Sequence, residues 1–116
     1  MNVDFAINLL EHDNKGLYMA TLIVSYPATE GTKFDREYYL SSHAQLVHSA
    51  WSEFGLQSAE ILFPAPGPQP FACVTVLRFR DQDGINAALS SPKTAEVVGD
   101  VANFTNTAPT IFHADE

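Results

Sequence analysis

The sequence is poor in cysteine and in basic side chains, and it contains no long apolar run. Its single cysteine, Cys73, excludes a disulfide within the chain, and the apolar residues around it favour a buried, inert thiol. Six basic residues stand against fourteen acidic ones, a formal charge of −8, which argues against nucleic acid and anionic membranes as partners. No segment approaches the ~20 apolar residues of a membrane span.

Signatures of cofactor and metal sites are missing as well. No glycine-rich loop follows a predicted strand, so no nucleotide cofactor is expected. On one helix, His43 and His48 would point about 140° apart and could not share a metal ion. Without a cysteine cluster or a histidine pair on one helix face, no metal site is expected either.

Residues 1–16 are expected to form an N-terminal extension that packs against the domain or against a partner chain. The segment MNVDFAINLLEHD carries acidic residues early and no basic residue before its apolar ones, which is unlike a secretory signal. We therefore expect a cytoplasmic protein.

Residues 17–116 are expected to form one domain. A chain of 116 residues, 46 % hydrophobic and 17 % charged, has the composition of a globular protein with room for one core. Four segments have the composition of β-strands: 17–26, 58–63, 71–79 and 107–113. The proline-rich loop 64–70 separates the second strand from the third.

The segment Phe34 to Gly55, FDREYYLSSHAQLVHSAWSEFG, has the periodicity of an amphipathic helix. Thr32 or Asp35 can cap its start, and Gly55 can end it. Its predicted apolar face places His43 in the middle and Trp51 at the edge. The apolar members of that face are Tyr39, Leu40, Leu46, Val47, Ala50 and Phe54.

A second helical region is predicted to open with Asp81-Gln82-Asp83-Gly84 and run through Leu89, with a break at Ser90 to Pro92 and a restart that stops at Gly99. A turn, residues 100–106, then leads to the last strand. The order β-α-β-β-α-β predicts an α+β ferredoxin-like fold, in which one antiparallel sheet carries its helices on one face.

The helices of such a fold cover only one face of the sheet. The first and third strands are nevertheless apolar on both faces, and a bare apolar sheet would not stay monomeric in water. We therefore expect a homodimer in which two sheets close into an α+β barrel.

Several motifs in this order resemble the EthD family, named from ethyl tert-butyl ether degradation. They are Tyr26-Pro27, the pattern F-D-x-x-Y-Y-x-x-x-H from Phe34 to His43, Leu46 and Trp51, Gly55-Leu56, and D-V-x-N-F-T from Asp100 to Thr105. The resemblance covers roughly residues 18–112. It implies a dimeric α+β barrel that holds a small hydrophobic organic ligand between sheet and helices without a bound cofactor.

His43 is the candidate catalytic residue. On an apolar helix face it suits a general base near neutral pH, and the resemblance matches it to the family's helix histidine. The alternative is a core histidine that hydrogen-bonds to a backbone carbonyl or to a tyrosine.

Five further residues are candidates for binding a ligand. Tyr26 could donate a hydrogen bond to a carbonyl oxygen, Tyr39 could orient His43 from one turn away, and Trp51 could form an aromatic wall, although packing explains each of them too. Asn103 and Thr105 could reach the mouth of the cavity. With Asp100 they are more typical of turn chemistry.

Two functions stay open from the sequence. The first is a cofactor-independent enzyme in which His43 is a general acid/base on a small carbonyl, lactone or polyketide-like compound. The second is a binding or accessory protein that delivers a hydrophobic small molecule to an oxidising system.

Overall fold

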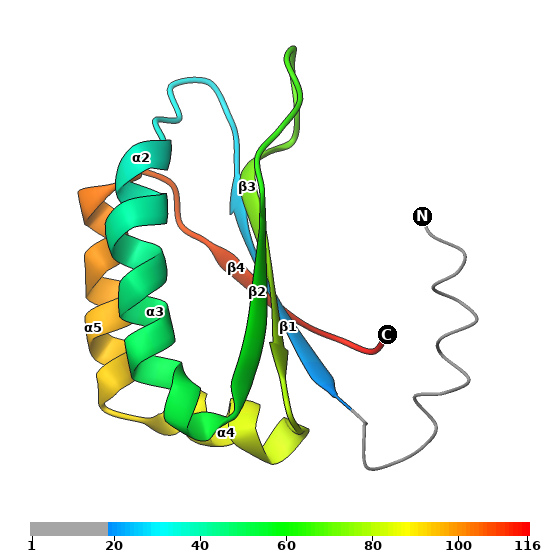
Figure 1. The fold of residues 1–116 in the computed structure, drawn as a ribbon. Helices are drawn as coiled ribbons and strands as arrows, with labels where there is room; N and C mark the ends of the chain where they lie inside the picture. Colours follow the sequence, from blue (N-terminus) through cyan, green and yellow to red (C-terminus); the bar gives the residue numbers. More distant parts are fainter. Residues whose placement is uncertain (1–18) are drawn as a thin grey trace.

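The structure is a computed structural model that describes residues 19–116 (Figure 1). The predicted N-terminal extension, residues 1–16, lies outside the described residues. Four strands form one sheet: β1 (Ala20–Pro27), β2 (Leu56–Leu62), β3 (Phe71–Phe79) and β4 (Thr110–Ala114). The sheet has the order β2-β3-β1-β4, and every neighbouring pair is antiparallel. The predicted ferredoxin-like topology is confirmed.

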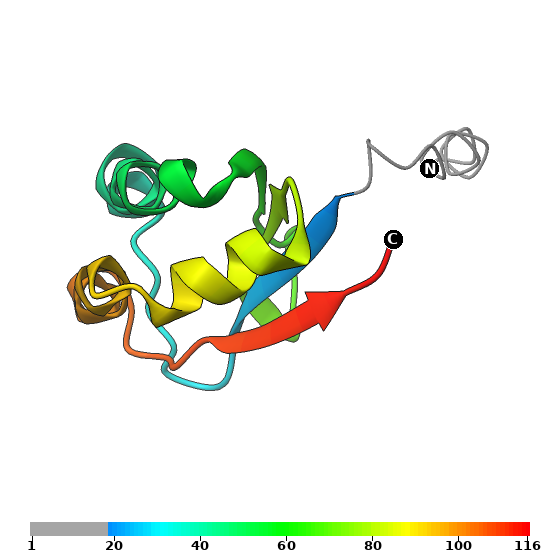
Figure 2. The ribbon, with the colours of Figure 1, turned by 90° about the horizontal axis from the view of Figure 1, so that it is seen from below.

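The helices all lie on one face of this sheet (Figures 1 and 2). The first helical unit comprises α2 (Arg36–Tyr38), a π-helical turn (Tyr39–His43), α3 (Ala44–Trp51) and a 3₁₀ turn (Ser52–Phe54). The second comprises α4 (Gln82–Ser90), α5 (Lys93–Asp100) and a 3₁₀ turn (Val101–Asn103). Of the two predicted N-caps it is Asp35 that accepts the Tyr38 N–H, and Gly55 ends the first unit at φ 95°.

The π-helical turn changes which residues of the first unit are buried. Its backbone bond runs from the Ala44 N–H to the Tyr39 carbonyl, so the turn holds one residue more than an α-helical turn. All later residues are therefore rotated about the helix axis relative to an unbroken α-helix. Trp51, predicted at the edge of the apolar face, is 4 % exposed, whereas Leu40, predicted on that face, is 48 % exposed. The prediction for Leu40 is wrong for this reason.

The second helical unit is longer than predicted. Helix α5 continues through Gly99 to Asp100, whereas the sequence suggested a stop at Gly99. Glycine ends a helix when it takes up a positive φ, and among the described glycines only Gly31, Gly55 and Gly67 do so. Asp100 therefore lies at the end of a helix and not in a free turn.

The other face of the sheet carries no helix among the described elements. The strand register places Ile23 opposite Val76 and Phe112, and places Leu62 opposite Val74. Phe112 is 62 % exposed and Leu62 is 56 % exposed. This surface, called the bare face below, is therefore mainly apolar, as predicted.

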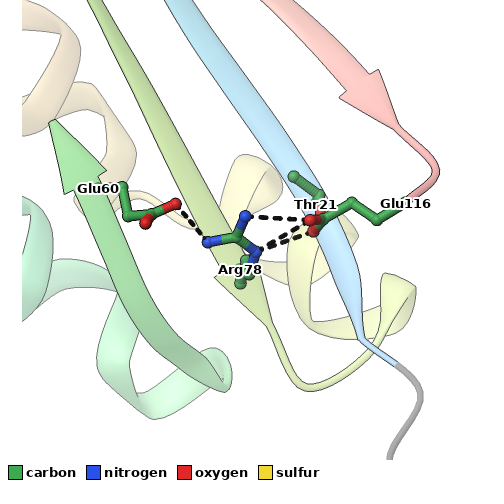
Figure 3. Close-up of polar contacts among 4 residues, drawn as sticks. All are labelled: Thr21, Glu60, Arg78 and Glu116. Carbon is green, nitrogen blue, oxygen red and sulfur yellow. Dashed lines mark hydrogen bonds and ion pairs between the residues drawn. The ribbon is translucent and has the colours of Figure 1, made fainter. Parts of the chain in front are cut away.

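One end of the bare face carries a group of ion pairs (Figure 3). Arg78 bridges Glu60, at 2.7 Å, and Glu116, at 2.9 Å, and the Thr21 hydroxyl also donates to Glu116. The hydrogen bonds that Arg78 donates to Glu116 and Glu60 raise its pKa. Arg78 is thus neutralised by its own neighbours.

Two glycines of the second helical unit form a matched test of the packing. A Cβ on Gly84 would stand 2.1 Å from the Phe54 carbonyl oxygen, whereas a Cβ on Gly99 would meet nothing within 4 Å. We expect Gly84→Ala to lower the free energy of unfolding by about 2 kcal/mol through overpacking. Gly99→Ala should raise it by up to ~1 kcal/mol through helix propensity. Urea denaturation measures both, and equal effects would contradict the packing described.

Candidate functional site

A cavity of about 460 Å³ lies between the sheet and the helices. The sheet supplies its floor, and α3 and α5 supply much of its roof. The wall is mainly apolar, which suits an organic ligand of modest size. Its apolar members include Val24, Val47, Trp51, Leu77, Leu89 and Val97.

His43 lies in the wall of this cavity and is only 2 % exposed. The π-helical turn brings its ring over that of Tyr39, one turn earlier, with centroids 5.3 Å apart and planes 25° apart. Phe104 packs against the imidazole from another side, with the ring centroids 4.6 Å apart. The ring is therefore held between two aromatic side chains.

Asp100 forms a hydrogen bond with one of the two nitrogens of this imidazole. His43 Nδ1 lies 2.9 Å from Asp100 Oδ2. An ionised carboxylate only accepts hydrogen bonds, so Nδ1 carries the hydrogen and donates it. Within residues 19–116 the structure gives Nε2 no hydrogen-bond partner. In the neutral ring Nε2 then carries a lone pair, which is the state of a base.

The other carboxylate oxygen of Asp100 is also occupied. Oδ1 accepts the Tyr38 hydroxyl at 2.7 Å and the Asn103 amide at 2.9 Å. Burial opposes ionisation of Asp100, but hydrogen bonds from Asn103, Tyr38 and His43 prevail and lower its pKa. The hydrogen bond to Asp100 raises the pKa of the Tyr38 hydroxyl. Asp100 is thus kept as an anion beside His43.

A second polar group lies next to the imidazole. The Tyr39 hydroxyl bonds to the Thr75 hydroxyl, and the Tyr26 ring packs edge-on against that of Tyr39. Burial raises the pKa of Tyr39 to about 12. Burial and the neighbouring Tyr39 raise the pKa of Tyr26 still further. Both phenols are therefore neutral near pH 7 and can donate hydrogen bonds.

The structure brings four of the six predicted site residues together. His43, Tyr26, Tyr39 and Trp51 all line the cavity. Asn103 and Thr105 are not in its wall: Asn103 is exposed and binds Asp100, and the buried Thr105 hydroxyl donates to the Lys33 carbonyl at 2.6 Å. Asn103 therefore acts on His43 only through Asp100.

Asp100 is the residue that sequence reasoning assigned to a turn. It lies 57 positions from His43, and periodicity within either helix cannot show that the two meet. One signal was available: Asp100, Asn103 and Phe104 belong to the same family-like motif, D-V-x-N-F-T. In the fold, Asp100 and Phe104 contact His43, and Asn103 contacts Asp100.

The described residues hold no group of three or more His, Cys, Asp or Glu side chains that could bind a metal ion. In the same part of the chain no helix has the length and apolarity to cross a membrane.

The EthD domain model matches residues 28–108. The chain belongs to the EthD family. A comparison with functionally curated proteins found no match to this chain.

Solved structures resemble this EthD protein over most of its length. An EthD-like protein from Ralstonia eutropha is 25 % identical, with a TM-score of 0.74 over 84 % of this chain and 90 % of its own. SnoaB, a cofactor-independent oxygenase from Streptomyces nogalater, is 13 % identical, with a TM-score of 0.60 over 84 % and 94 %. A dimeric ferredoxin-like protein from Jannaschia is 17 % identical, with a TM-score of 0.60 over 84 % and 99 %. The last two show likeness of fold alone.

The lowered pKa of Asp100 predicts a pH dependence of the stability of this EthD domain. Ionised Asp100 stabilises the fold above the ordinary Asp pKa of 3.8, and this contribution is lost as the pH falls through the lowered pKa. The difference in unfolding free energy between the natural protein and Asp100→Asn should therefore shrink below about pH 4.

Denaturation at a series of pH values measures this difference. Asp83→Asn, which removes an exposed carboxylate from α4, is the matched control. A difference for Asp100→Asn that stayed constant from pH 7 to pH 2 would contradict the ionised contact.

Proposed function

We propose that the protein is a cofactor-independent enzyme in which His43 is the general acid/base on a small hydrophobic carbonyl, lactone or polyketide-like compound. The observation that carries this proposal is the 2.9 Å contact between His43 Nδ1 and Asp100 Oδ2. It fixes the tautomer and leaves Nε2, on a cavity-lining residue, as the basic nitrogen. A histidine with only a packing role has no need of a partly buried carboxylate partner.

The reaction begins with removal of a proton next to the substrate carbonyl. Nε2 takes the proton, and the electron pair of the C–H bond moves to the carbonyl oxygen as an enolate. Asp100 stabilises the imidazolium that forms, and the neutral Tyr26 and Tyr39 hydroxyls supply hydrogen bonds to the enolate oxygen. Return of the proton to another carbon gives isomerisation, whereas loss of a leaving group or attack on a second carbonyl gives elimination or cyclisation.

The likeness to SnoaB supports only the general class. That protein shares the fold and is described as a cofactor-independent oxygenase, so this architecture can carry out chemistry on an organic molecule without a bound group. The choice of proton transfer over oxygenation rests on His43 and Asp100.

A second candidate function is ligand binding without turnover, as in an accessory protein of an oxidative degradation pathway. The favouring observation is that the Tyr39 hydroxyl already bonds to the Thr75 hydroxyl. This bond must rearrange before Tyr39 can stabilise an enolate, whereas a ligand held by apolar contacts requires no such change.

Exchange of protons for deuterium tests the proposed base without knowledge of the natural substrate. 2-Tetralone is a suitable probe because its protons next to the carbonyl exchange in D2O, which NMR follows directly. We expect the protein to accelerate this exchange and His43→Gln to reduce the acceleration by about 100-fold or more, the usual contribution of a general base. Asp100→Asn should also reduce it, because an amide can donate to Nδ1 and move the hydrogen to Nε2.

The control for these variants is Ser41→Ala, which removes an exposed hydroxyl bonded to the Glu37 carbonyl in the same helical unit. It should keep the natural rate. Binding of 2-tetralone with equal exchange rates in the natural protein and His43→Gln would reject the enzyme and favour the accessory protein.

We also propose that the protein is a homodimer joined through the bare face, so that two sheets enclose an α+β barrel. The apolar surface of the bare face supports this proposal, since water would otherwise cover it. It comprises the exposed Phe112 and Leu62 and the half-buried Ile23, Val74 and Val76. The Jannaschia protein of the same fold is described as dimeric. Internal pairing of Arg78 avoids the cost of burying a lone cation at such an interface.

Phe112→Asp should raise the dimer dissociation constant by about 100-fold or more, because it places a charge in an apolar interface. Leu40→Asp is the matched control, since Leu40 is an exposed leucine on the helical side of the molecule. Light scattering coupled to gel filtration measures both. A monomeric natural protein, or a dimer that Leu40→Asp breaks and Phe112→Asp does not, would overturn the proposed interface.

A further inference from the structure

The cavity is polar at one end and apolar at the other. The strand register places Tyr26 near the end of β1, opposite Cys73, and Val24 opposite Thr75. His43 and Tyr39 lie at the same end, at the start of the first helical unit. Trp51 lies at the other end of α3, within the apolar cluster that also includes Leu77 and the adjacent Leu89.

Among the buried side chains of the described cavity wall, unused hydrogen-bonding capacity lies at the polar end. At the apolar end, Trp51 Nε1 donates to Thr94 Oγ1 at 2.8 Å, and that hydroxyl donates onward to the Ala88 carbonyl. At the polar end, His43 Nε2 has no partner among residues 19–116. An enol hydroxyl could therefore donate to Nε2, and a carbonyl oxygen could accept from the neighbouring Tyr26 or Tyr39 hydroxyl, whereas neither finds a buried partner near Trp51.

The distance between the two ends sets the length of the ligand. His43 and Trp51 are eight residues apart, which corresponds to about 12 Å along a helix axis. The remaining polar side chains of the wall, Gln45, His48, Gln57 and Ser58, are exposed and form its rim. They are exposed, and the buried polar group at the apolar end, Trp51 Nε1, is already bonded to Thr94.

We infer that the ligand is an elongated ketone, or its enol, whose oxygen lies at one terminus of an apolar body about 12 Å long. This inference rests on the proposed function and narrows its substrate class. It favours long-chain or linearly fused compounds over small ketones and small lactones, because these fill only the polar end.

Two isomers of undecanone provide a direct test. 2-Undecanone and 6-undecanone have the same composition, but only the first can place its oxygen at His43 while its chain extends to Trp51. We expect 2-undecanone to bind about tenfold tighter, because the central carbonyl of 6-undecanone is buried without a partner. Calorimetry measures the affinities, and the emission of Trp51, the one tryptophan of the chain, reports whether the apolar end is reached.

The series of 2-ketones from 2-butanone to 2-undecanone tests the length. Affinity should rise about fourfold with each added methylene until the cavity is filled. Leu89→Phe should bring the plateau to shorter chains, and Leu89→Ala should move it to longer ones. Leu40→Ala, outside the cavity, should leave the series unchanged.

The outcomes separate this inference from the proposed function. Equal affinities for the two undecanones, an affinity that does not depend on chain length, or no ketone binding would overturn the inference. The predicted series together with no deuterium exchange on 2-undecanone would leave the ligand class standing and reject catalysis. Deuterium exchange that depends on His43 but shows no preference for chain length would support catalysis and reject the elongated ligand. If Leu89→Phe fails to fold, the isomer pair and Leu89→Ala still decide the outcome.

Discussion

The hydrogen bond between His43 and Asp100 connects the two helical units. It joins the π-helical turn of the first unit to the last residue of α5 in the second. Tyr38 and Asn103 hold the same carboxylate, and Phe104, which follows the second unit, packs on the imidazole. The site is therefore built by the tertiary fold itself. A change in the angle between the helical units would alter the hydrogen bond at His43 Nδ1 and the position of Nε2.

Because side chains alternate along the strands, the sheet has two apolar faces. Helices cover one of them, and the other is the bare face. On β1, the residues from Leu22 to Tyr26 that point to the helices form the core and the floor of the cavity, while Ile23 points to the bare face. The same period-two pattern thus provides an enclosed site on one side and an unpartnered apolar surface on the other. Ligand binding and self-association are proposed for opposite faces of one sheet.

Much of the fold follows from local patterns in the sequence. Strand-like composition predicted the four strands, and Asp35 and Gly55 marked the ends of the first helical unit because each has a specific backbone role. Two features did not follow. The π-helical turn depends on tertiary contacts of Tyr39 and His43, so helical periodicity of 3.6 residues misplaced Leu40 and Trp51. Asp100 became visible as the partner of His43 only when residues far apart in the chain were brought together.

The protonation of the two imidazole nitrogens of His43 is the most direct test of this account. Long-range ¹H–¹⁵N NMR spectra of labelled protein, recorded where the ring is neutral, distinguish a protonated nitrogen from a bare one. We expect hydrogen on Nδ1, a bare Nε2, and a change at Nε2 when 2-undecanone binds. Hydrogen on Nε2, or a ring whose spectrum is the same in Asp100→Asn, would contradict the claim that Asp100 prepares His43 as a base facing the cavity.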